Sequence, residues 1–134
     1  ISGAVEWLSP DNEEDHWDII EGQGSLFHPS FAGVSLGLLH GSQPDKFIVC
    51  HEPTRSNMRG VKNKLPSISE VISKTIELGK LTNPDITCAG IALNTSNMLN
   101  SPEDMKKLIS DKYSIPCLDP LKDSLKVFIN MIDK

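Results

Sequence analysis

Short apolar runs alternate with longer amphipathic stretches along this chain, and that alternation restricts the folds it can adopt. The short runs predict strands at residues 18–20, 46–50, 87–93 and about 115–118. Strands separated by helix-length segments indicate βαβ units and a parallel sheet. We therefore predict an α/β fold in three layers, with helices on both faces of a mostly parallel sheet.

The helices between and after these strands carry recognisable start signals. Ser67 and Glu70 have the spacing of a capping box, and apolar residues recur with helical period after them. Ser101 followed by Pro102 and two acids predicts a second helix start, with Ser101 as a possible cap. The expected helices span residues 31–40, 67–81, 102–112 and 121–132.

Composition places the chain among ordinary globular domains. Its 134 residues suit a single domain, 1–134, and a net charge of −5 gives no basic surface for nucleic acid or anionic lipid. No apolar stretch approaches the roughly 20 residues of a membrane helix. The odd cysteine count gives no disulfide framework, so we expect Cys50, Cys88 and Cys117 to be buried thiols of a cytoplasmic protein.

The segment WDIIEGQGS ends an apolar run in an acid and two glycines. Parallel sheets bind ligands at the carboxyl ends of their strands, so this position predicts a ligand crevice. Glu21 is a candidate magnesium ligand or general base, and the alternative is an acceptor of backbone hydrogen bonds in a turn. Gly22 and Gly24 permit positive φ and close approach of a ligand, although a tight turn alone would also require them.

Polar side chains also follow each of the first three expected strands. His28, in the loop after the first strand, and His51, in the segment CHEPTR, are candidates for proton transfer. Arg55 in the same segment can grip phosphate or carboxylate, or can pair with a surface acid such as Asp45. Asn94 ends the third strand, where it can read a base edge or close an Asx turn.

Several familiar signatures are absent from the sequence. It contains neither a Walker A loop nor a GxGxxG motif, so these residues lack a phosphate cradle of their own. We assign Asp119, at the end of the fourth strand, no role beyond starting the last helix. The four histidines have none of the spacings typical of zinc sites: His16, His28, His40 and His51.

Taken together, the segments DIIEGQGSLFHPSFAGVSLGLLHGSQPD, CHEPTR, AGIALNTS and IPCLDPL resemble the C-terminal P-loop-type domain of a family of unknown function. The resemblance covers nearly the whole chain. Some members of that family are described as D-glutamate N-acetyltransferases, which implies acetyl-CoA as a cofactor and a D-amino acid as a substrate.

A wider similarity connects IEGQGS to the VEGAGG segment of dethiobiotin synthetase, and GIALN to that enzyme's strand-end asparagine. It implies that Glu21 lies near phosphate and Mg²⁺, and that Asn94 meets adenine. In that pattern the Walker-type loop and a Rossmann-like domain lie upstream of Ile1, so we expect a P-loop-like domain truncated at its N-terminal side.

Two classes of function follow. The first is an enzyme domain binding ATP with Mg²⁺ or acetyl-CoA, either an N-acetyltransferase or an ATP-dependent ligase. Its catalytic candidates are Glu21, His28 and His51, and its cofactor-binding candidates are Gly22, Gly24, Arg55 and Asn94. The second is a non-catalytic binding or assembly module. In both, a truncated sheet exposes an edge strand, so we expect a homo-oligomer and a small-molecule partner, with neither nucleic acid nor membrane.

Overall fold

The computed structural model describes residues 1–133 and divides them into two compact units. The N-terminal unit comprises Ile1–Asp45 and Ser73–Ile86, and the sheet unit comprises Lys46–Ile72 and the chain from Thr87 onward. The elements are α1 (Ser2–Leu8), α2 (Ala32–Ser42), β1 (Lys46–His51), α3 (Ile68–Gly79), β2 (Thr87–Leu93), α4 (Pro102–Tyr113), β3 (Cys117–Leu118) and α5 (Lys126–Ile132). That the chain forms a single domain stays a prediction.

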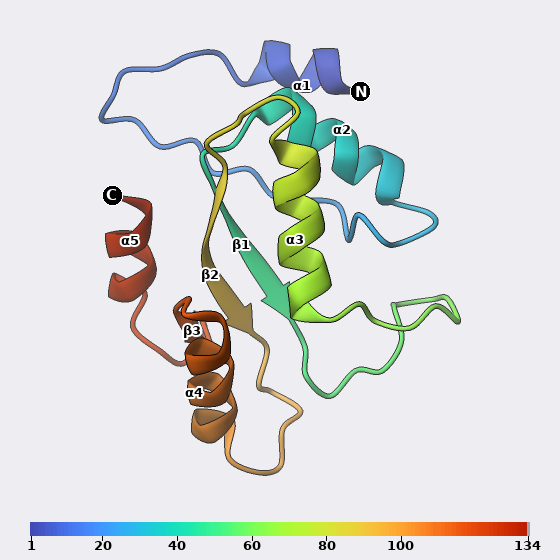
Figure 1. Ribbon diagram of the computed structural model, residues 1–134, viewed down its shortest axis with the longest axis vertical. Coiled ribbons are helices and arrows are strands. Elements are labelled where there is room, and N and C mark those ends of the chain that lie inside the picture. The colour runs from blue at the N-terminus through green and yellow to red at the C-terminus, as the bar shows by residue number, and fades with distance from the viewer. Residues whose placement is uncertain (134) are drawn as a thin grey trace. The chain divides into compact units, whose positions relative to one another are not determined.

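The sheet has the order β1-β2-β3, and both strand pairs are parallel. Figure 1 shows β1 and β2 side by side, with the short strand β3 beyond β2. The chain passes through α3 between β1 and β2, and through α4 between β2 and β3, as parallel pairing requires. The α/β class and the three strands expected at residues 46–50, 87–93 and 115–118 are confirmed.

The strand expected at residues 18–20 is wrong. This segment forms no regular structure, and Ile19 is 91% exposed. A strand needs a hydrogen-bonded neighbour, and in the described part of the chain β1 pairs with β2 alone. Glu21 therefore follows an irregular, exposed segment rather than a buried strand.

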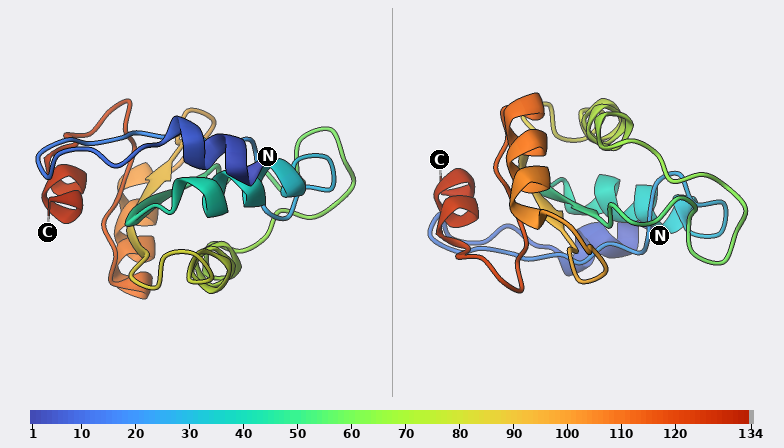
Figure 2. Two further views of the ribbon diagram at one scale, coloured as in Figure 1. Left: turned by 90° about the horizontal axis from the view of Figure 1, so that it is seen from above. Right: turned by 90° about the horizontal axis from the view of Figure 1, so that it is seen from below.

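Alternating residues of β2 build a core on each face of the sheet. Ile91 and Leu93 lie in a cluster with side chains from β1, the first turn of α3 and α4. On the opposite face Ala92 joins Phe128 of α5, whose ring lies against the backbone of Gly90. The sheet unit thus has the first residues of α3, up to Ile72, and α4 on one face and α5 on the other; Figure 2 shows α4 and α5 as separate helices in both views.

The helix starts follow the sequence signals in part. The capping box is confirmed, because Ser67 N–H donates to Glu70 (2.8 Å) and Glu70 N–H donates to the Ser67 hydroxyl (3.2 Å). Ser101 has φ 42° and makes no side-chain cap, so that expectation is wrong although α4 does begin at Pro102. The last helix begins at Lys126 rather than at residue 121, because a turn around the Asp119 carbonyl uses the preceding backbone.

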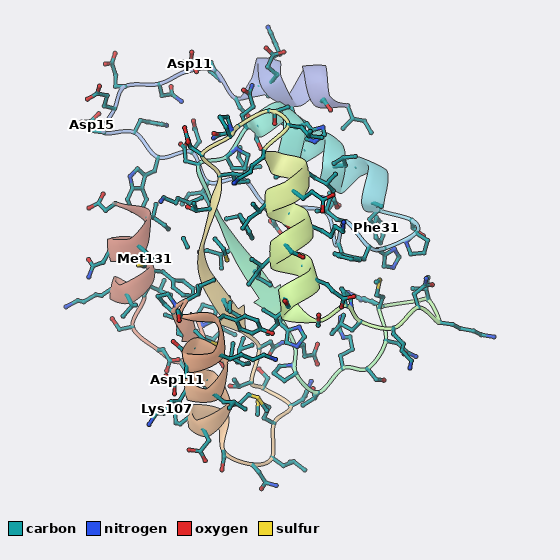
Figure 3. The ribbon with its side chains drawn as sticks, viewed as in Figure 1. Asp11, Asp15, Phe31, Lys107, Asp111 and Met131 are labelled. Carbon is teal, nitrogen blue, oxygen red and sulfur yellow. The ribbon has the colours of Figure 1, made fainter. Side chains whose placement is uncertain are left out.

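In the N-terminal unit, α1 packs closely on α2 over two glycines. A Cβ on Gly37 would lie 2.6 Å from the Ile1 side chain, and one on Gly41 would lie 2.4 Å from the carbonyl of Ser2. Glycine at these positions lets the helices approach. Figure 3 shows Asp11 and Asp15 on the long connection that follows α1, where both are exposed.

The cysteines differ from the expectation of buried thiols. Cys50 is exposed because it alternates with the buried Val49 along β1, whereas Cys88 and Cys117 are partly buried. Burial raises the pKa of the Cys88 thiol and raises that of Cys117 to about 11. Among the described residues, no helix is long and apolar enough to cross a membrane.

Candidate functional site

A cavity of about 330 Å³ opens at the carboxyl ends of the three strands, within the sheet unit. This is the place where parallel sheets generally bind ligands. A larger hollow of about 590 Å³ lies between α4 and α5, away from the strand ends, and contains Asp111 as its one charged side chain. We take the smaller cavity as the candidate site because ionisable and amide side chains converge on it. Its lining comprises Cys50, His51, Glu52, Arg55, Ala92, Leu93, Asn94, Asp119, Pro120 and Leu121.

His51 is the last residue of β1 and is half-buried. Burial lowers the pKa of its imidazole, and the nearby negative charge of Glu52 opposes that shift only in part. Since the ordinary value is 6.5, the ring is neutral at pH 7. The backbone carbonyl of His51 accepts a hydrogen bond from Asn94 N–H at 2.9 Å, which continues the ladder past the end of β2. A neutral imidazole fixed at a cavity wall can accept a proton.

The next residue, Glu52, organises the surrounding loops. Its carboxylate accepts hydrogen bonds from Asn97 Nδ2 (3.0 Å) and Thr54 Oγ1 (3.3 Å), and it forms an ion pair with Arg55. The hydrogen bond from Asn97, with smaller contributions from Arg55 and Thr54, holds its pKa below the ordinary value. Glu52 thus joins the loop after β1 to the loop after β2. The sequence reading missed Asn97 entirely, because only the fold brings it to Glu52.

Arg55 pairs with Glu52 of its own segment rather than with Asp45, the acid that the sequence reading offered as an example. Its side chain is 43% exposed, and one guanidinium nitrogen, Nη2, meets Glu52. Among the described residues, the other guanidinium N–H groups have no protein partner. A planar guanidinium with donors to spare can bind a carboxylate or a phosphate on two atoms.

Asn94 forms the predicted Asx turn, since its Oδ1 accepts a hydrogen bond from Ser96 N–H at 3.0 Å. Its Nδ2 has no partner within the described residues, and the exposed side chain lines the cavity. The turn occupies the acceptor half of the amide and leaves the donor half available to a ligand.

Asp119 has a structural role that the sequence alone did not indicate. The residue is 1% exposed, and its carboxylate accepts hydrogen bonds from the Thr95 hydroxyl, from Thr95 N–H (3.3 Å) and from Leu121 N–H (3.0 Å). Lys122 Nζ lies 3.7 Å away. These contacts, the Thr95 hydroxyl first, hold the pKa of Asp119 below its usual value despite burial. The carboxylate is charged and joins the ends of β2 and β3.

Four other candidates, Glu21, Gly22, Gly24 and His28, belong to the N-terminal unit. Glu21 and Gly22 are exposed, and Gly24 has φ 75°, the conformation that favours glycine. His28 is 6% exposed; its Nδ1 accepts a hydrogen bond from Ser30 N–H at 3.1 Å, and its ring packs on Phe31. The structure thus brings together His51, Arg55 and Asn94 at one cavity, while the roles of the other four stay predictions.

Among the residues that the structure describes, no three His, Cys, Asp or Glu side chains gather as a metal site would require. The two carboxylates of the cavity are already engaged by side-chain and backbone donors. The proposed magnesium ligand Glu21 lies in the other unit and is not tested by this observation.

The cavity suits part of a larger organic ligand. Its volume is at the lower end of the range for small-molecule pockets, roughly 300–1,000 Å³. An amide donor, a guanidinium and a neutral imidazole lie around apolar side chains of β2. A cavity of this volume has room for a group of about the size of a nucleobase or an amino acid.

Comparison with known proteins gives consistent matches. Residues 1–129 match the P-loop domain of the family described as a domain of unknown function, DUF1611. A D-glutamate N-acetyltransferase from a Pseudoalteromonas species is 54% identical over 93% of this chain and 38% of its own length. A second, from Tritonibacter scottomollicae, is 43% identical over 91% of the chain and 37% of its own length. The crystal structure of a DUF1611 family protein from Anabaena variabilis superposes with a TM-score of 0.83 at 26% identity, covering 98% of this chain and 40% of that one.

Proposed function

Because the chain belongs to the DUF1611 family, two relatives of which carry the name D-glutamate N-acetyltransferase, we propose that it supplies the substrate cavity of such an enzyme. The chain spans less than half of the length of the relatives it matches, so the activity is proposed for the full-length protein. The observation that carries the proposal is the convergence of His51, Arg55 and Asn94 on one cavity at the strand ends.

In the proposed reaction, the amine nitrogen of the D-amino acid attacks the thioester carbonyl of acetyl-CoA. A C–N bond forms, the C–S bond breaks, and coenzyme A leaves as a thiolate that takes up a proton. The amine must first lose a proton from its ammonium form. His51 is the candidate base, because burial keeps its imidazole neutral at pH 7 and ready to accept that proton.

Arg55 supplies the cationic group of the proposed site. Both substrates carry anions, the carboxylates of D-glutamate and the phosphates of acetyl-CoA, and a guanidinium binds either group through paired hydrogen bonds. Glu52 holds Arg55 by an ion pair, which reduces the freedom that the side chain loses when ligand binds. If Arg55 binds the carboxylate, its replacement raises the KM of D-glutamate. If it binds the phosphate, its replacement raises the KM of acetyl-CoA.

Asn94 is proposed to donate from its unengaged Nδ2 to a polar acceptor of acetyl-CoA, in the cavity that it shares with His51. Of the two cofactors expected from the sequence, acetyl-CoA is supported by the names of the relatives. The acceptor is proposed to be a small D-amino acid.

The test is a steady-state assay of full-length protein with acetyl-CoA and D-glutamate, following release of the coenzyme A thiol. We expect turnover with D-glutamate, and a loss of kcat of at least about 100-fold in His51→Gln, the usual size of a general-base contribution. His40→Gln is the matched control, because His40 contacts the Leu78 carbonyl and lies in the other unit. Equal kcat in wild type and His51→Gln would remove His51 from the mechanism, and turnover that requires ATP would favour the ligase.

A further inference from the structure

We infer that Asp119 is a positioning residue, which acts through Thr95 to hold the carboxamide donor of Asn94 toward bound acetyl-CoA. The inference rests on the proposed function of the cavity. It starts from the way in which β2 and β3 are joined. Their ladder contains two residue pairs, Ile91 with Cys117 and Ala92 with Leu118. Beyond Leu118, the chain segments that follow β2 and β3 are joined by a side chain.

That side chain is the carboxylate of Asp119. Its Oδ2 accepts hydrogen bonds from both the hydroxyl and the backbone N–H of Thr95, and its Oδ1 accepts one from Leu121 N–H. Thr95 and Asp119 are each 1% exposed. A buried carboxylate in this setting is stable only with its donors in place, so the contact fixes Thr95 firmly.

Thr95 is bonded directly to Asn94, and Asn94 is held from its other side as well. Asn94 N–H donates to the His51 carbonyl at 2.9 Å, which attaches it to β1. The backbone of Asn94 therefore lies between two fixed points, His51 at the end of β1 and Asp119 directly after β3. Its Oδ1 is held by Ser96 N–H, which leaves Nδ2 as the group with freedom to meet a ligand.

Lys122 completes this arrangement from the solvent side. Its Nζ donates to Thr95 Oγ1 at 2.7 Å and lies 3.7 Å from Asp119 Oδ2, while its side chain is 53% exposed. The ammonium offsets the charge of the buried carboxylate. Lys122 is outside the set of residues that line the cavity, so it acts on the site through Thr95.

A neighbouring contact has the chemistry of this cluster but meets Asp119 through its backbone and not through the carboxylate that binds Thr95. Lys106 Nζ meets Asp123 Oδ2 at 2.6 Å and Glu103 Oε1 at 2.8 Å, and Asp123 also accepts a hydrogen bond from Asp119 N–H. Lys106 lies on α4, is buried, and does not line the cavity. Lys106→Met therefore removes a buried ionic contact near Asp119 and serves as the control for a purely structural effect.

The experiment measures the Kd of acetyl-CoA by calorimetry and the KM of D-glutamate with full-length protein. Thr95→Val keeps the shape of the side chain and removes its hydroxyl. Thr95→Ser keeps the hydroxyl and removes the methyl group. We expect Thr95→Val to weaken acetyl-CoA binding about tenfold, the equivalent of one charge-assisted hydrogen bond. The KM of D-glutamate should stay within about twofold, Thr95→Ser should bind like wild type, and Lys106→Met should lower the unfolding midpoint with an unchanged Kd.

The pathway through Asn94 is tested by combining variants. Asn94→Ala should weaken acetyl-CoA binding by itself, and adding Thr95→Val should then have little further effect, because both changes disable one group. Should Thr95→Val fail to fold, Lys122→Met tests the same contact from its exposed side. We expect a weakening of a few-fold that disappears in the Asn94→Ala background.

The outcomes separate the two proposals. If Asn94→Ala weakens acetyl-CoA binding while Thr95→Val and Lys122→Met leave it unchanged, the proposed function stands and the positioning role is overturned. Additive effects in the double variants also overturn it. If wild-type protein binds no acetyl-CoA, or Asn94→Ala binds it as wild type does, the proposed role of Asn94 fails and the positioning role fails with it.

Discussion

Replacing Gly90 by alanine tests how α5 is held against the sheet. Gly90 lies in β2, and a Cβ built on it would lie 2.4 Å from Phe128 Cε1, 2.8 Å from Cδ1 and 2.9 Å from Cζ. Ordinary contacts of a Cβ begin near 3.4 Å. The ring is 5% exposed, so it must move by about 1 Å within a packed environment.

The expected loss follows from two opposing effects. Overpacking of this kind costs about 1–3 kcal/mol. The φ of Gly90 is outside the positive range, so alanine can adopt the backbone, and the smaller conformational freedom of the unfolded chain returns about 0.4–1 kcal/mol. We predict a net decrease of about 1–2 kcal/mol in the free energy of unfolding.

The assay is urea unfolding followed by circular dichroism. Gly22→Ala is the control, because nothing lies within 4 Å of a Cβ at that position and its φ is not positive. Phe128→Leu removes the ring atoms that a Cβ would meet, so the double variant should be more stable than the sum of the two single losses by about 1 kcal/mol. Wild-type stability of Gly90→Ala, or strict additivity, would refute the packing of Phe128 on Gly90.

Three further predictions concern capping, a buried ion pair and pH. Ser67→Ala should lower the free energy of unfolding, measured in urea, by about 1 kcal/mol. Ser69→Ala, two residues further along, should change it little, and equal losses in the two variants would contradict the capping box. Lys106→Met should cost up to about 3 kcal/mol at pH 7, because it leaves Asp123 without its cation; the loss should become smaller as pH falls below 3.8 and Asp123 takes up a proton, and a pH-independent loss would contradict the ion pair. Burial lowers the pKa of His51 below 6.5, so the folded protein loses stability as pH falls below 6.5, and His51→Gln should flatten that decline; parallel profiles would contradict this.

Local sequence signals predicted the regular elements well where the decisive contacts are also local. The bounds of β2 match the apolar run at residues 87–93, and the capping box of Ser67 and Glu70 forms as its spacing indicates. The pairing of Arg55 with Glu52 is also local, because the turn in which Arg55 N–H donates to the Glu52 carbonyl brings the two side chains together. The failure at residues 18–20 has the opposite cause, since an apolar run becomes a strand only beside a partner, which periodicity does not reveal.

The candidate site shows the same division. His51, Arg55 and Asn94 were found from the rule that parallel sheets bind ligands at their strand ends, and the fold brings all three to one cavity. Asp119 stands at the end of a strand too, but its contact with Thr95 joins residues 24 positions apart and exists only in the folded chain. The exposure of Cys50 depends likewise on which face of β1 is covered.

Calorimetric titration of full-length protein with acetyl-CoA tests whether the cofactor binds in the proposed cavity at the strand ends. Arg55→Met keeps the length of the side chain and removes its charge and donors, while Arg59→Met, four residues further along the same loop, serves as the control. The account predicts saturable binding to wild type and a weakening of about tenfold or more in a cavity variant, Arg55→Met or Asn94→Ala, with Arg59→Met close to wild type. Equal affinity in wild type, Arg55→Met and Asn94→Ala would place the binding site elsewhere and contradict the account.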